Sequence, residues 1–124
     1  MADRLRNNAC NTIALVRNTE RTVVKASGEI TATGQTAAVD VADYTEGLLF
    51  VKITALTAVT TIDFTVETYD GAEWFNMGLT IAQQTATGEL LIPVTNFGEQ
   101  IRVTYAMGGA AHTATFAINF IGKS

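Results

Sequence analysis

Few residue types that carry out chemistry occur in this chain, and they do not cluster. His112 is the only histidine and Cys10 is the only cysteine. A nucleophilic site needs its nucleophile beside a base, but Cys10 lies in an N-terminal stretch whereas His112 begins the last apolar run. We therefore predict no catalytic residues and interpret His112 as a polar residue of the turn after Gly108-Gly109. A single cysteine also rules out an internal disulfide and a thiolate metal cage.

Carboxylates are the only plentiful functional group. Asp40, Asp43 and Glu46 recur at every third position of the loop sequence VDVADYTEG. Oxygen ligands at this spacing would converge on a calcium ion if the loop curled around it. The spacing differs from the EF-hand pattern, and solvated turn carboxylates are the simpler interpretation. We predict no metal and no cofactor.

The sharpest local feature is the stretch Tyr69-Asp70-Gly71-Ala72-Glu73-Trp74-Phe75. Asp70-Gly71 between two apolar runs predicts a tight hairpin. Trp74 has three interpretations: it packs beneath its own turn, as in an Asp-box hairpin, it fills a partner's pocket, or it stacks on a sugar ring with Tyr69. The first is the simplest, and Trp74 is also our candidate for partner binding in the folded domain.

Basic residues are concentrated at the N-terminus. Residues 1–25 hold five basic and two acidic side chains, a net charge of +3, whereas the rest of the chain holds three and ten, a net of −7. The apolar patch Ile13-Ala14-Leu15-Val16 within this stretch is too short for a stable isolated helix. We predict that residues 1–20 form an extended arm that becomes ordered against a partner. Its expected contact residues are Arg4, Arg6, Ile13, Leu15, Val16 and Arg17.

From Arg21 onward, apolar and polar residues alternate with the period of a β-strand. The clearest strands are predicted at 62–69, 101–107 and 114–120, and weaker ones at 22–26, 36–41, 74–79 and 89–94. The stretch 47–56 is apolar on both sides at its start, which is typical of a central strand covered on both faces. Pro93 indicates an edge strand. We predict an all-β fold, an antiparallel β-sandwich of about eight strands over residues 21–124, jelly-roll-like or immunoglobulin-like, with the extended arm at residues 1–20.

Composition limits the partners. Charged residues make up 16% of the chain, below the roughly 25% of typical soluble domains, which indicates a surface partly covered by neighbours. The sequence pI of about 4.8 argues against nucleic-acid binding, which needs a basic face. Neither a signal peptide nor a long apolar span is evident. We expect a soluble protein without a nucleic-acid or membrane partner, made in a cytoplasm that keeps its lone thiol reduced.

Three stretches carry a family resemblance: residues 34–41 (GQTAAVDV), 69–75 (YDGAEWF) and 94–105 (VTNFGEQIRVTY). In this order and spacing they resemble small virion proteins of tailed bacteriophages that decorate or cement an icosahedral head. The resemblance implies a non-enzymatic protein on the capsid exterior, with the major capsid protein as partner and a homo-oligomer, with a trimer favoured. Tail and neck proteins contain related sandwiches. A carbohydrate-binding or adhesion module, with Tyr69 and Trp74 on a host glycan, is the alternative from another class.

On that expectation the arm has a physical role. Arginine side chains pair well with carboxylates, such as those of an outer capsid surface. The apolar residues Ile13, Leu15 and Val16 would enter a groove or add a strand to a sheet edge. An arm that becomes ordered on binding increases the contact area and bridges neighbouring subunits.

Overall fold

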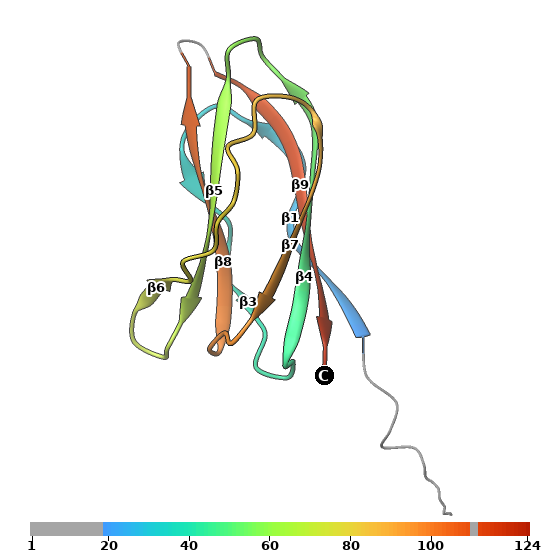
Figure 1. Ribbon diagram of the computed structural model, residues 1–124, viewed down its shortest axis with the longest axis vertical. Coiled ribbons are helices and arrows are strands. Elements are labelled where there is room, and N and C mark those ends of the chain that lie inside the picture. The colour runs from blue at the N-terminus through green and yellow to red at the C-terminus, as the bar shows by residue number, and fades with distance from the viewer. Residues whose placement is uncertain (1–18, 110–111) are drawn as a thin grey trace, which may run out of the picture.

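The computed structural model describes residues 19–109 and 112–124, and every regular element in these residues is a β-strand. The strands are β1 (Thr19–Ile30), β2 (Gly34–Gln35), β3 (Val39–Asp40), β4 (Glu46–Leu56), β5 (Thr61–Tyr69), β6 (Trp74–Asn76), β7 (Gly88–Thr95), β8 (Gln100–Gly108) and β9 (Ala114–Lys123). They form two antiparallel sheets packed face to face (Figure 1). The predicted all-β antiparallel sandwich is confirmed.

The strand order identifies the topology. Sheet A has the order β1-β9-β4-β7, and sheet B has the order β2-β8-β5-β6 with β3 also paired to β8. Because β2 and β3 lie along the same partner strand, they act as one interrupted strand, and each sheet then has four strands. The chain changes sheet at every connection except the β5–β6 hairpin. This is the eight-stranded jelly roll, whereas an immunoglobulin domain would divide its strands differently.

The edge position of Pro93 is confirmed, because β7 is the outer strand of sheet A.

The strands predicted over 36–41 and 74–79 are wrong in their bounds. Thr36 accepts a hydrogen bond from the backbone N–H of Val103 through its side-chain Oγ1, at 3.1 Å. A hydroxyl thus replaces a backbone acceptor, and the ladder is interrupted there. The strand predicted over 74–79 ends at Asn76. The side-chain oxygen of Asn76 accepts a hydrogen bond from the backbone N–H of Gly78, at 2.7 Å, and caps a turn there.

The core lies between the two sheets. Its centre is Phe116 of β9, which is fully buried. The Phe116 ring packs edge-on against Phe64 and Tyr105 of sheet B, with each pair of ring centroids 5.3 Å apart. Ile62, Phe64 and Val66 of β5 all point inward and are buried, as their alternation predicts.

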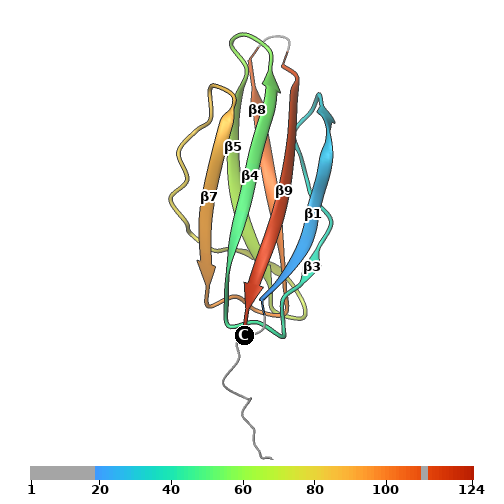
Figure 2. The ribbon, with the colours of Figure 1, turned by 90° about the vertical axis from the view of Figure 1, so that its right-hand side faces the viewer.

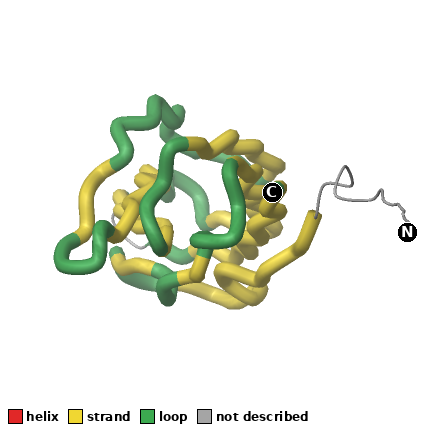
Figure 3. The backbone as a smooth tube through the Cα atoms, turned by 90° about the horizontal axis from the view of Figure 1, so that it is seen from below, coloured by secondary structure: helices red, strands yellow, loops and turns green. Residues whose placement is uncertain are grey.

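At one end of the sandwich, where β1 begins and β9 ends (Figures 1 and 3), two glycines make room for aromatic rings. Gly47 and Gly122 are cross-strand partners in β4 and β9. A Cβ atom on Gly122 would overlap the ring of Tyr44, and one on Gly47 would overlap the ring of Phe120. The two rings pack against each other with centroids 5.9 Å apart. Tyr44 therefore closes this end of the core.

Candidate interaction surfaces

All but one of the residues predicted to bind a partner lie outside the described residues: Arg4, Arg6, Ile13, Leu15, Val16 and Arg17. The structure does show where the arm joins the sandwich. Thr19 pairs with Lys123 at a corner of sheet A. The next residue, Glu20, accepts a hydrogen bond from the hydroxyl of Tyr44. That hydrogen bond, together with burial and nearby carboxylates, raises the pKa of Tyr44 to about 12. The first residues of β1 are thus tied to the closed end of the core.

The remaining candidate, Trp74, lies on the outer face of sheet B. Its ring packs against its cross-strand partner Tyr69, with ring centroids 5.0 Å apart. The guanidinium of Arg102 lies over the indole, 4.2 Å from the ring centroid. Arg102 Nε is in turn 2.7 Å from Glu67 Oε1. Because a cation of the same chain covers the indole, this geometry favours the structural interpretation of Trp74 over stacking on a sugar.

The hairpin beside Trp74 is confirmed. Asp70 Oδ1 accepts the backbone N–H groups of Ala72, at 2.7 Å, and of Glu73, at 2.8 Å. Gly71 has a φ of 104°, a conformation in which glycine avoids the steric cost of a Cβ. The hydrogen bonds from Glu73 and Ala72 favour the charged carboxylate and lower the pKa of Asp70. The turn is therefore held by the ionised form of Asp70.

The loop carboxylates do not gather around a common point. Asp40 Oδ1 accepts the backbone N–H of Ala42 at 3.0 Å, which is a local turn contact. Within residues 19–109 and 112–124, no group of three His, Cys, Asp or Glu side chains is arranged to hold a metal ion. His112 Nδ1 lies 2.9 Å from the carbonyl oxygen of Gly109. This histidine therefore interacts with the backbone of its own turn.

The outer face of sheet A, which is turned toward the viewer in Figure 2, carries an apolar surface that our sequence analysis did not assign. Three of its side chains are strongly exposed: Val23 of β1 at 54%, Phe50 of β4 at 40% and Leu91 of β7 at 57%. They lie in one row across the sheet, because Phe50 pairs with Leu91 on one side and with Asn119 on the other, and Asn119 pairs with Val23. We define the sheet A patch as Val23, Leu48, Phe50, Leu91, Pro93 and Ile121.

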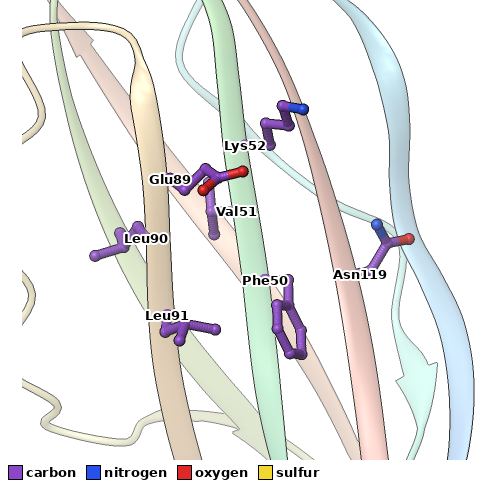
Figure 4. Close-up of a pocket in the computed structure, with 7 residues that line it drawn as sticks. All are labelled: Phe50, Val51, Lys52, Glu89, Leu90, Leu91 and Asn119. Atoms are coloured by element: carbon purple, nitrogen blue, oxygen red, sulfur yellow. The ribbon is translucent and has the colours of Figure 1, made fainter.

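The sheet A patch is hollowed rather than flat. Figure 4 shows the side chains of Phe50 and Leu91 beside each other on neighbouring strands, with Asn119 across from them. Lys52 and Glu89, opposite each other in the register, border this hollow at one end. A second hollow adjoins it, lined by Phe50, Asn119, Ile121 and Arg21. Charged residues therefore frame an apolar centre.

The expectation that the central strand is covered on both faces is wrong for the described residues. Strand β4 is central in sheet A, and its inward side chains Leu49, Val51 and Ile53 are buried. Its outward residues Leu48 and Phe50 have no layer of the described chain above them, as Figure 2 shows. Runs of adjacent apolar residues in β4 and β7 are the sequence signal for this surface, because strict alternation would have made their outward positions polar.

The outer face of sheet B has the opposite character. The outward side chains of β5 and β8 are mostly polar there, with Asp63, Thr65 and Glu67 opposite Ala106, Thr104 and Arg102. Asp63 also accepts a hydrogen bond from Gln83 at 3.0 Å. This face is therefore the conventional solvent-facing side of an antiparallel sheet.

No protein family, curated protein or solved structure matches this chain. Among the described residues, no helix is long and apolar enough to cross a membrane.

Proposed function

We propose that this protein is a non-enzymatic structural component of a tailed-bacteriophage virion, which binds the outside of the icosahedral capsid and stabilises its lattice. The observation that carries the proposal is the sheet A patch, an open apolar surface on an otherwise complete jelly-roll core, which suits a protein that packs against neighbouring subunits in a lattice. The major capsid protein is the proposed partner, and the protein acts as a homo-oligomer on the capsid exterior.

The patch supports an assembly role because its exposure is unfavourable in water. Burying apolar surface contributes roughly 25 cal/mol per Å². Contiguous exposed apolar surfaces framed by polar residues generally mark sites of protein association. Val23, Phe50 and Leu91 lie in one row of such a surface. In a protein that belongs to a lattice, such a face would be buried against a neighbouring subunit.

The charge of the arm supports the same role. Thr19, the first described residue, pairs with Lys123 at a corner of sheet A. The arm carries the basic residues Arg4, Arg6 and Arg17, whereas the remainder of the chain is strongly acidic. Because the arm carries these basic residues and the body is acidic, carboxylates of another molecule would attract the arm and repel the body.

The fold fits the proposal without deciding it. Jelly rolls occur in viral capsid proteins and also in lectins, and function is decided by sites and not by folds. Carbohydrate binding through Tyr69 and Trp74 is the less favoured alternative, because Arg102 covers the indole ring. A tail or neck protein would use the same surfaces in another part of the virion.

The test is co-sedimentation with undecorated capsids. We expect saturable binding by the full chain and a large loss of affinity in the variant Arg4→Glu/Arg6→Glu/Arg17→Glu, with the loss smaller at high salt. The matched control is Arg102→Glu on the outer face of sheet B, which should bind as the full chain does if it remains folded. Equal binding by the arm variant would refute the role of the arm.

A chain that begins at Thr19 provides a second comparison, because it retains all of β1 and the contact between Glu20 and Tyr44. Failure of the full chain to bind any capsid would contradict the decoration proposal. Screening against a glycan array, with Trp74→Ala as the control, would then test the carbohydrate alternative.

A further inference from the structure

The outward side chains of β4 follow a pattern that is complementary to itself. In chain order the first four are Glu46, Leu48, Phe50 and Lys52, an acid, two apolar residues and a base. Consecutive members are two residues apart, so they are spaced by about 6.7 Å along one face of the strand. A second copy of this row, turned end for end and laid against the first, would meet it with apolar residues in the middle and opposite charges at both ends.

We propose that two copies of the chain associate face to face through the sheet A patch. The two-fold axis lies between the two facing sheets and runs perpendicular to β4. The rotation places Leu48 of each copy against Phe50 of the other, and Glu46 of each copy against Lys52 of the other. Such an isologous contact uses one patch twice, so each favourable pair occurs twice. The occupant of the patch is therefore a second copy of this chain.

The neighbouring strands agree with this arrangement. The same rotation sets Leu91 against Pro93 on β7 and Ile121 against Asn119 on β9, given the observed registers. The remaining charged residues of these two strands face uncharged ones: Lys123 against Ala117, and Glu89 against Thr95. No residue of these strands meets a like charge in the second copy. Glu46 and Lys52, which lie opposite Lys123 and Glu89 in their own chain, each face a further opposite charge there.

The size of the surface indicates a weak contact. Four strands about 4.8 Å apart and seven residues long cover roughly 19 Å by 23 Å, or about 440 Å² of each copy. Stable complexes typically bury about 800 Å² per partner, so we expect exchange between monomer and dimer. On a capsid, where the proposed function would hold copies at high local concentration, the same contact would link neighbouring copies.

The experiment is analytical ultracentrifugation of the full chain over a wide concentration range. We expect the weight-average mass to rise toward that of a dimer for the unaltered chain, and Phe50→Thr to remain monomeric. Glu46→Lys alone and Lys52→Glu alone should each weaken association by about tenfold or more, because each places like charges in contact. The double variant Glu46→Lys/Lys52→Glu should restore association to near that of the unaltered chain.

Asp63→Lys, which makes the same change of charge on the outer face of sheet B, is the matched control and should leave association unchanged. Thermal unfolding of each variant separates loss of contact from loss of fold. A chain that is monomeric at every concentration, or that forms a trimer, would overturn the proposal, as would single charge variants that associate normally. If a monomeric chain binds capsids and Phe50→Thr abolishes that binding, the patch belongs to the capsid contact: the dimer is refuted and the proposed function stands.

Discussion

The two outer faces of this sandwich differ in whether their side chains find partners within the chain. On sheet B, Arg102 pairs with Glu67 and covers Trp74, so the polar and aromatic side chains find partners within the chain. On sheet A, Phe50 and Leu91 contact each other across two strands and remain 40% and 57% exposed. The polar face is completed by its own residues, whereas the face of sheet A leaves large apolar side chains exposed.

The difference arises from the alternation of the strands. In β5 every second residue is polar or faces a polar partner, so its outward side favours water. In β4 the residues from Leu48 to Val51 are all apolar, so both sides of the strand favour burial. The outward side of β4 therefore contributes Leu48 and Phe50 to the sheet A patch, where β5 presents polar side chains to water.

The largest expected effect compares two phenylalanines on opposite sides of sheet A. Phe116→Ala would leave a cavity against Phe64 and Tyr105 and should reduce the free energy of unfolding by about 3–5 kcal/mol. Phe50→Ala, on the outer face, should change it by no more than about 0.5 kcal/mol in dilute solution. Urea unfolding of both variants measures the difference. Similar losses would mean that the outer face is already covered within the chain.

The buried core residues were predictable from the sequence, whereas the sheet A patch on the outer face was not. Alternation in β5 and β9 correctly placed Ile62, Phe64 and Phe116 in the core. The choice between jelly roll and immunoglobulin topology depends on which distant strands pair, such as β1 with β9, and local patterns do not determine this. The sheet A patch is assembled from residues of all four strands, so no single stretch of sequence contains it.

The next effect concerns the polar face. Arg102→Ala removes both the ion pair with Glu67 and the cation over the indole, and should lower the free energy of unfolding by roughly 1 kcal/mol. The fluorescence of Trp74, the only tryptophan, should change with it. The matched control on sheet A is Arg21→Ala, which removes only a 3.5 Å contact with Asn119 and should have almost no effect. Equal effects would contradict the view that sheet B is completed by its own contacts.

A smaller effect is expected at a site on neither face. Val59, in the turn between β4 and β5, has a φ of 62° and is 79% exposed. A β-branched residue is strained in this conformation, so Val59→Gly should raise the free energy of unfolding by about 0.5–1 kcal/mol without altering association. Asn96→Gly, at a φ of 59° that asparagine tolerates, is the control and should be near neutral. A destabilised Val59→Gly variant would contradict the assignment of strain.

The smallest effect is the pH response of the hairpin beside Trp74. Because hydrogen bonds from Glu73 and Ala72 lower the pKa of Asp70 below its ordinary value of 3.8, its contribution is fully present above that value. It is lost as the pH falls through the lower pKa of the folded state. Fluorescence of Trp74 at decreasing pH should report this loosening. Asp70→Asn should flatten the response, and an unchanged titration in that variant would refute the assignment.

The most direct test of the difference between the faces is amide NMR of the full chain at increasing protein concentration. We predict that resonances change for outward residues of β4, β7 and β9, with Phe50 and Leu91 among the largest, while those around Arg102 and Trp74 stay constant. Constant resonances throughout, or changes centred on the outer face of sheet B, would contradict the claim that sheet A is the face completed by another copy of the chain.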